Sequence, residues 1–150
     1  MNGAQEKVGY VHGYSPEEEA RLRQQGSILE PYVYPFIQFK EASHVLELGC
    51  GVGAQTEVLL RRFPTLKVTA VDYVPAQISA AKRMLTDIDK GRVTWEVADG
   101  TRLPYPDATF DGVFICWLLE HTPDPLAVLK EANRVLKPGG VLYATEVFNE

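Results

Sequence analysis

The apolar positions of the chain fall into five short runs, separated by stretches with helical spacing. The runs are His44–Leu48, Lys67–Asp72, Arg92–Val97, Phe110–Ile115 and Val141–Phe148. Most of these runs are apolar at successive positions, so that both faces of the strand are apolar. This pattern is typical of strands buried on both faces of a sheet. We therefore predict a parallel sheet covered by helices on its two faces.

Helical signals fill the gaps between these runs. Ser15, followed by Pro16 and by Glu18, forms a capping box and predicts a helix that stops at Gly26. Further helices are predicted over 28–40, 54–63 and 75–87, and from 125 to the Pro-Gly-Gly segment at 138–140. We expect the last helix to bury one apolar face, made of Leu126, Leu129, Val135 and Leu136.

The alternation of strands and helices defines an α/β, doubly wound, Rossmann-like sheet of about five strands with an N-terminal helical arm. We assign residues 1–40 to the arm and its helices, and 41–150 to the sheet domain. In such sheets ligands bind outside the carboxyl ends of the strands, at the point where the strand order reverses. The chemistry is therefore expected at the end of the first strand.

Composition narrows the class of protein. A chain of 150 residues is the size of one domain, and its net charge of −5 argues against a nucleic-acid binder or a polybasic membrane-surface protein. No apolar run approaches the roughly 18 residues that span a bilayer. The first residues lack a secretion signal, and Cys50 and Cys116 lack metal-ligand spacing. We predict a cytoplasmic protein with reduced thiols and no metal.

Three glycines follow the first strand directly. Gly49, Gly51 and Gly53 stand between that strand and the helix predicted from residue 54. Glycine lets the backbone approach a ligand without interference from a Cβ atom, and the N–H groups that begin the helix point into the same space. This context predicts a loop that cradles a cofactor.

Acidic residues end or follow the first three strands, and they bear on which cofactor binds. Glu47 lies beside the glycine loop, Asp72 ends the second strand and Asp99 follows the third. Gly49, Gly51 and Ala54 also satisfy the G-x-G-x-x-G/A spacing of a dinucleotide site, so an NAD-dependent oxidoreductase is an alternative. Three carboxylates attract a cationic nucleoside and repel a diphosphate. The acids therefore favour a cofactor that carries an ammonium and a sulfonium.

Five segments, in order along the chain, resemble the motifs of the class I S-adenosylmethionine-dependent methyltransferases, in their small-molecule branch. They are Val45–Gly53, Val71–Asp72, Ala98–Pro104, Phe110–His121 and Arg134–Gly140. The resemblance runs from about Val45 to Phe148 and implies the strand order 3-2-1-4-5. It also implies S-adenosyl-L-methionine as cofactor and a small-molecule methyl acceptor.

The resemblance assigns a role to each matching residue. Backbone at Gly49, Gly51 and Gly53 would contact the methionine moiety, and Glu47 would orient its amino group. The remaining cofactor-binding residues would be Asp72 at the ribose, Tyr73 beside the adenine, Asp99 and Gly100 at the adenine edge, Cys116 at the methionine end, and Tyr14 and Gln25 from the arm.

Methyl transfer requires alignment of acceptor, methyl and sulfur, and a general base only where the acceptor must lose a proton. His121, near the end of the fourth strand, is the candidate base; simple packing in its loop is the alternative. The family's sixth and seventh strands have no counterpart here, so we expect a C-terminally incomplete domain. The fifth strand would then be an exposed edge through which two copies could associate. A catalytically silent binding or scaffold module stays open as a further alternative.

Overall fold

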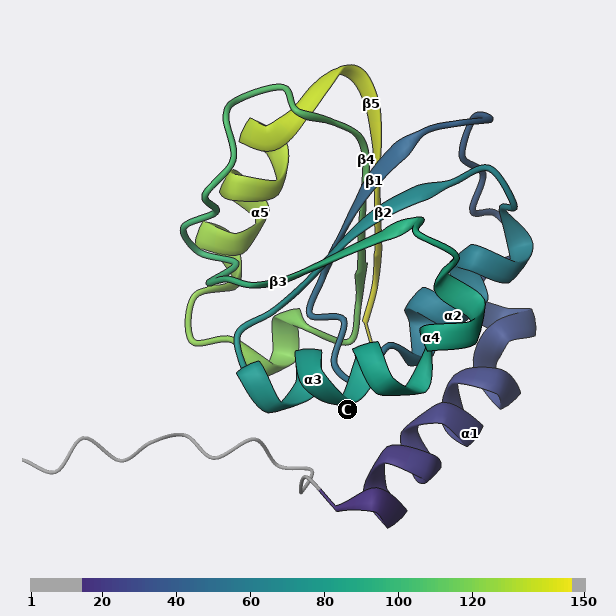
Figure 1. Cartoon of the computed structure of the whole chain (residues 1–150). Coiled ribbons are helices and arrows are strands. Elements are labelled where there is room, and N and C mark those ends of the chain that lie inside the picture. Colours follow the sequence, from purple (N-terminus) through teal and green to yellow (C-terminus); the bar gives the residue numbers. More distant parts are fainter. Residues whose placement is uncertain (1–14, 147–150) are drawn as a thin grey trace, which may run out of the picture.

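The computed structural model describes residues 15–146. They form a five-stranded sheet in the order β3-β2-β1-β4-β5, with every neighbouring pair parallel (Figure 1). The strands are β1 His44–Leu48, β2 Lys67–Asp72, β3 Val93–Val97, β4 Phe110–Cys116 and β5 Leu136–Thr145. The predicted fold class and strand order are confirmed. The order reverses between β1 and β4, which puts the carboxyl end of β1 at the switch point.

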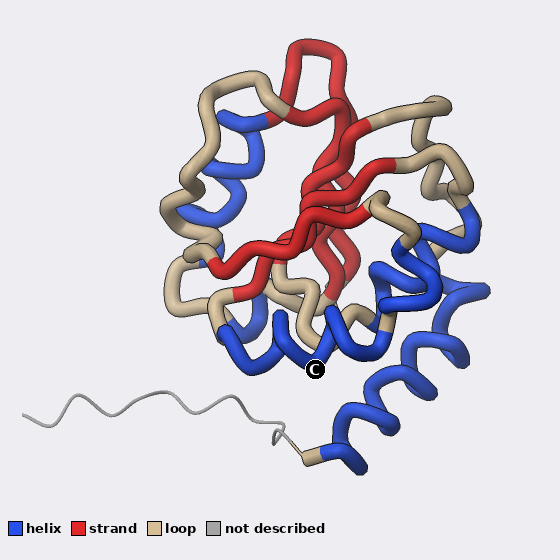
Figure 2. The backbone as a smooth tube through the Cα atoms, viewed as in Figure 1, coloured by secondary structure: helices blue, strands red, loops and turns tan. Residues whose placement is uncertain are grey.

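Helices cover both faces of this sheet. They are α1 Pro16–Val33, α2 Ala54–Arg62, α3 Pro75–Met84, α4 Thr86–Asp89 and α5 Pro125–Val135, with a short 3₁₀ turn, η1, at Leu119–His121. Helix α5 lies on one face of the sheet, and α2, α3 and α4 lie on the other, with α1 outside α2 (Figures 1 and 2).

Strand β1 separates two hydrophobic cores because its side chains alternate between the two faces. Val45 belongs to the core beneath α1 and α2, while Leu46 and Leu48 belong to the core beneath α5. Val45, Leu46 and Leu48 are each no more than 1% exposed. Glu47 points to the same side as Val45, so its carboxyl group lies within the first core.

The arm differs from the prediction. Instead of one helix that stops at Gly26 and a second over 28–40, α1 is a single helix that ends at Val33. Ser15 caps it as predicted, with its hydroxyl oxygen accepting from the Glu18 N–H at 3.2 Å. Gly26 is buried against α2, where an added Cβ would lie 3.3 Å from the Gln55 Nε2 atom. The close contact explains the glycine: it lets two helices approach and does not end the first.

The end of α1 is fixed to α2 by polar contacts. Glu30 forms ion pairs with Arg61 at 2.6 Å and with Arg62 at 3.0 Å. Tyr34, only 1% exposed, donates its hydroxyl to the Gln55 Oε1 atom at 2.7 Å. Such tertiary contacts allow a proline within the helix, Pro31, although the helix ends soon afterwards.

Two further helix predictions differ from the structure. The helix predicted over 75–87 is interrupted at Leu85, between α3 and α4. Helix α5 buries Val128, Ala132 and Val135, whereas Leu126 is 60% exposed, so the apolar face predicted to include Leu126 was wrong at that position.

Strand β5 begins earlier than the predicted Val141. Helix α5 ends at Val135, and residues 136–140 already belong to the strand, with a register shift between the Phe110 and Gly112 pairs of β4. Positions 147 and 148 of the predicted strand lie outside the described residues. As predicted, β5 is a sheet edge, and Val141 and Leu142 are 39% and 40% exposed there.

Candidate cofactor site

The glycine loop between β1 and α2 is held against the end of β2. Gly49 and Cys50 both donate their N–H groups to the Val71 carbonyl, at 2.8 and 3.0 Å, and Gly51 donates to the Asp72 Oδ2 atom at 2.9 Å. Gly51 has a φ of 53°, a left-handed conformation that glycine adopts without strain. The loop therefore turns at the strand-order switch point, as the motif predicts.

Asp72 connects this loop to the next crossover. Its Oδ2 atom accepts from Gly51 and its Oδ1 atom accepts from the Val74 N–H, each at 2.9 Å. Burial raises the pKa of Asp72, an effect that these backbone hydrogen bonds oppose. Each carboxylate oxygen retains a second lone pair for a donor on a ligand.

Glu47 is a buried carboxyl group beneath the loop. It is 2% exposed, and its Oε2 atom accepts from the Thr56 hydroxyl of α2 at 2.6 Å. Burial raises the pKa of Glu47 to about 8, and the charge of Asp72 acts in the same direction. The groups that act on this pKa include no positive charge. At neutral pH Glu47 therefore keeps its proton, and a cation placed beside it would favour the carboxylate.

A cavity of about 140 Å³ opens beside the loop. It brings together five of the predicted site residues: Gly49, Gly51, Cys116, Gln25 and His121. Its other lining residues are Leu22, Cys50, Val52, Ala54, Gln55, Trp117 and Glu120. Burial raises the pKa of Cys116 to about 12, so its thiol stays protonated and serves as a wall of the cavity.

The predicted adenine contacts lie further along the same sheet edge. Asp99 follows β3 and accepts from the Thr101 N–H at 2.8 Å, so its carboxylate stabilises its own turn. Gly100 faces Val128 of α5, and Tyr73, which follows β2, is 74% exposed. None of these three residues lines the cavity beside the glycine loop. Their adenine contacts stay a prediction.

Gly53 ends the glycine loop and also packs closely against α3 and Leu85. An added Cβ would lie 2.9 Å from a Leu85 methyl group and 3.3 Å from Ala81 Cβ, and the φ of Gly53 is 85°. Its predicted contact with the methionine moiety stays a prediction. Tyr14, predicted from the arm, lies outside the described residues.

Sequence reasoning missed the residue that fixes the loop after β4. Glu146 follows β5, and its Oε1 atom accepts from the N–H groups of Leu118 and Leu119 at 3.1 and 3.0 Å. Trp117, between β4 and that turn, has a φ of 54°, which is uncommon for a non-glycine residue. Only the sheet pairing brings Glu146 to this turn, so no local pattern could have indicated it.

His121 lies at the end of η1 on the rim of the same cavity. Its Nε2 atom is 3.4 Å from a carboxylate oxygen of Glu120, and its side chain is 28% exposed. A histidine beside a cavity and a carboxylate can accept a proton from a bound molecule. Its role as a base stays a prediction.

Comparison with known proteins agrees with the motifs. Residues 46–144 match the methyltransferase domain family, and these residues include the last three residues of β1, the glycine loop and all but the last residue of β5. The chain belongs to this family. The resemblance predicted from the five ordered segments is thereby confirmed.

Individual relatives and structures are similar to this chain. The 27-O-demethylrifamycin SV methyltransferase of Amycolatopsis mediterranei is 34% identical over 87% of this chain and 48% of its own length. Demethylmenaquinone methyltransferase of Staphylococcus aureus is 33% identical over 71% of this chain and 44% of its own length. The chain thus spans about half the length of the curated relatives it matches.

Among solved structures, an S-adenosylmethionine-dependent methyltransferase from Aquifex aeolicus superposes with a TM-score of 0.70 at 26% identity. The match covers 84% of this chain and 69% of that one. The PH0226 protein from Pyrococcus horikoshii superposes with a TM-score of 0.69 at 31% identity, over 85% and 58% of the two chains.

Between residues 15 and 146, no helix is long and apolar enough to cross a membrane. Within the same range, no three His, Cys, Asp or Glu side chains gather as a group that could hold a metal ion.

Proposed function

We propose that this chain is the cofactor-binding part of an S-adenosylmethionine-dependent methyltransferase with a small-molecule acceptor. The observation that carries the proposal is a pair of carboxyl groups beside a glycine loop at the switch point, the buried Glu47 and the half-buried Asp72. Membership of the methyltransferase domain family supports it, as do relatives named for methylation of a rifamycin and of a menaquinone precursor.

The residues around the loop fit the cofactor. Glu47 would accept from the ammonium group of the methionine moiety, and Asp72 would accept from the ribose. The backbone of Gly49 and Gly51 would lie against the methionine end, with Cys116 as the opposite wall. Asp99, Gly100 and Tyr73 would receive the adenine at the ends of β2 and β3, and Gln25 would close the cavity from α1.

The residues that line the cavity would support methyl transfer by holding the acceptor in place. When bound, S-adenosylmethionine supplies a methyl group on a positively charged sulfur. The chain's own task is alignment of the acceptor, for which oriented binding contributes up to about 7–11 kcal/mol in ideal cases. His121 would take a proton from an acceptor that must lose one, and Trp117 would wall the acceptor side.

The dinucleotide alternative fits less well. A diphosphate at Gly51 would lie beside Asp72 and above Glu47, with no lysine or arginine among the residues that line the cavity. The negative charge of Asp72 would repel a diphosphate at this short range, and the protonated Glu47 would offer it no positive charge. The family match also favours methyl transfer over hydride transfer and over a silent scaffold.

We further propose that the protein works in the cytoplasm, since Cys50 and Cys116 are both unpaired and buried. We assign cofactor binding to residues 41–150 and closure of the site to 1–40. Two copies could associate through the exposed edge of β5 at Val141 and Leu142.

Isothermal titration with S-adenosylhomocysteine tests the function. We expect the wild-type chain to bind it, Asp72→Asn to weaken binding at least 10-fold, and NAD to give no heat. Asp87→Asn, a change at an exposed carboxylate on α4, is the matched control and should bind like the wild type. Tighter binding of NAD than of S-adenosylhomocysteine, or an unaffected Asp72→Asn variant, would contradict the proposal.

A further inference from the structure

The turn that follows β4 is held by the end of the neighbouring strand, β5. The Trp117 N–H group donates to the Thr145 carbonyl at 2.9 Å. The next two N–H groups, of Leu118 and Leu119, donate to the Glu146 Oε1 atom at 3.1 and 3.0 Å. The Glu146 Oε2 atom is buried without a hydrogen-bond partner among the described residues. Within that part of the chain, the polar contacts of the Glu146 carboxylate are therefore those with the turn.

This turn does not hold its shape by local preference alone. Trp117 has a φ of 54°, in the left-handed region that a bulky residue rarely adopts. Such a conformation persists where the surrounding structure fixes it. The two N–H groups that Glu146 accepts follow directly after Trp117, so loss of the carboxylate would let the turn relax.

The turn packs against the glycine loop and forms one wall of the cavity of about 140 Å³. At Gly49, the three nearest heavy atoms to an added Cβ all belong to Leu118, the closest at 2.8 Å. Trp117, Glu120 and His121 line the cavity. A shift of the turn would therefore disturb the contact with Gly49 and the cavity wall together.

We propose that Glu146 is a positioning residue for the methionine end of the cofactor, because it holds the turn after β4 against the glycine loop. This role rests on the proposed function, which assigns the methionine moiety to the space between Gly49 and Cys116. Glu146 is not among the residues that line the cavity, so it acts through the turn and does not touch the ligand.

Titration calorimetry with S-adenosylhomocysteine tests this role on two variants. Glu146→Ala removes the acceptor of both N–H groups, and we expect it to weaken binding on the order of 10-fold. Glu146→Gln keeps an oxygen that can accept from both groups, so it should bind close to the wild type. Recovery by glutamine separates the hydrogen bonds from the charge of the carboxylate.

Asp89→Ala is the matched control for a loss of stability. Asp89 also accepts from two N–H groups, the Val93 backbone at 2.8 Å and the Trp95 indole at 3.1 Å. It precedes β3, at the amino ends of the strands and so at the opposite edge of the sheet from the cavity. Both alanine variants should unfold at a lower temperature than the wild type. Measured well below both midpoints, only Glu146→Ala should show a lower affinity.

A truncated ligand locates the effect within the site. 5′-Methylthioadenosine retains the adenosine and lacks the amino-acid end of S-adenosylhomocysteine. Because the turn lies beside the proposed position of that end, Glu146→Ala should weaken binding of 5′-methylthioadenosine much less than binding of S-adenosylhomocysteine.

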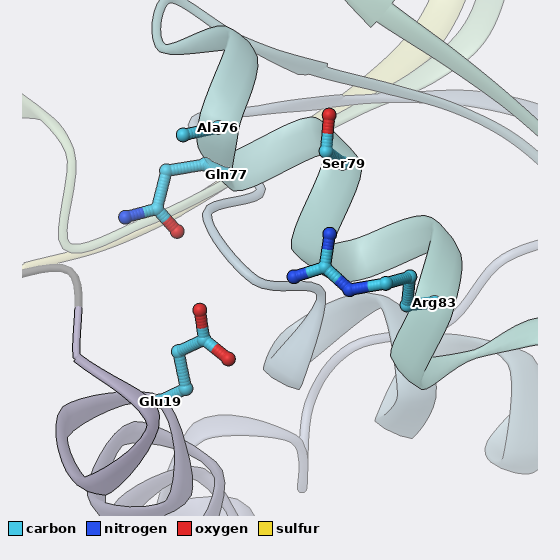
Figure 3. Close-up of a pocket in the computed structure, with 5 residues that line it drawn as sticks. All are labelled: Glu19, Ala76, Gln77, Ser79 and Arg83. Atoms are coloured by element: carbon cyan, nitrogen blue, oxygen red, sulfur yellow. The ribbon is translucent and has the colours of Figure 1, made fainter.

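A second cavity, of about 350 Å³, provides a further control. It lies between α1 and α3, with Glu19 on the α1 side and Arg83 on the α3 side, and no residue of the turn after β4 lines it (Figure 3). Arg83→Ala should therefore bind S-adenosylhomocysteine like the wild type. A loss of affinity in Arg83→Ala with none in Glu146→Ala would assign the ligand to this second cavity and overturn the inference.

Two other results would overturn it: equal affinity of the wild type and Glu146→Ala for S-adenosylhomocysteine, or the same fold loss for both ligands. Either would leave the proposed function standing, because the wild type would still bind S-adenosylhomocysteine. If the wild type does not bind 5′-methylthioadenosine, Asp89→Ala decides: a loss confined to Glu146→Ala supports the inference, and a loss shared by both variants overturns it. Absence of S-adenosylhomocysteine binding by the wild type would instead remove the proposed function, and the inference with it.

Discussion

Glu47→Gln probes the group that most directly connects stability with binding. The carboxyl of Glu47 is buried against Thr56, and burial raises its pKa from the usual 4.5 to about 8. Between these two pH values the folded chain keeps a proton that the unfolded chain releases. Stability must therefore fall as the pH rises from 4.5 to 8, and this contribution is constant outside that window.

The magnitude follows from the two pKa values. One pKa unit corresponds to about 1.4 kcal/mol, so the loss reaches about 3 kcal/mol at pH 7 and about 5 kcal/mol above pH 8. Glutamine has nearly the same shape, accepts from Thr56 and has no proton to lose. Glu47→Gln should match the wild type near pH 4 and exceed its stability by about 3 kcal/mol at pH 7.

Urea unfolding at a series of pH values measures this difference. Glu41→Gln is the matched control, because Glu41 is exposed and its substitution should leave the pH profile unchanged. If the wild type and Glu47→Gln differ by the same amount at pH 5 and at pH 8, Glu47 does not hold a proton in the folded chain. The account of the buried acid would then be wrong.

The same group predicts a proton signal on binding. With a pKa of about 8, Glu47 is roughly nine-tenths protonated at pH 7 before the ligand arrives. An ammonium group beside it favours the carboxylate, so binding of S-adenosylhomocysteine should release up to about one proton. Titration in phosphate and in Tris, whose ionisation enthalpies differ, should give different apparent heats for the wild type and equal heats for Glu47→Gln.

Three other substitutions test the supports of the site by thermal unfolding. Tyr34→Phe removes the donor to Gln55 and should cost about 1–3 kcal/mol, with an unchanged stability contradicting the anchoring of α1 on α2. Gly53→Ala should destabilise by roughly 2–5 kcal/mol through strain and overpacking, and Gly51→Ala by only about 1–2 kcal/mol, since space is open there. Equal losses would refute this packing difference. Glu146→Ala leaves two half-buried N–H groups of the loop after β4 without their acceptor and should cost about 1–3 kcal/mol, whereas no loss would show that Glu146 is not needed there.

The order of the sheet and the position of the loop could be predicted because local signals agreed with one another. Each strand is an apolar run bounded by turn residues, and Gly49, Gly51 and Gly53 stand directly between a strand and a helix. A parallel sheet then gathers the carboxyl ends of its strands at one edge. Once the strands and helices are predicted, Asp72 is therefore expected beside the glycine loop.

The errors arose where distant contacts override local preference. Gly26 is a helix breaker by propensity, yet in the fold it lies inside α1 and packs closely against Ala54 and Gln55 of α2. Leu126 fits an apolar helix face, but the sheet covers only the face of Val128, Ala132 and Val135. Among the described residues, the Gln77 Oε1 atom is buried without a hydrogen-bond donor only because α3 packs onto the rest of the fold, so no sequence pattern could have indicated it.

The polar groups of the site determine which class of ligand it favours. Asp72 accepts hydrogen bonds beside Gly51, and Glu47, which lies in the core beneath the loop, keeps its proton until a positive charge is placed beside it. A ligand lowers the free energy of such a site most if it is rich in donors and positively charged. An ammonium, a sulfonium and a ribose with both hydroxyls meet that demand. A diphosphate, which offers acceptors and negative charge, would give these groups no donor and would repel the Asp72 carboxylate.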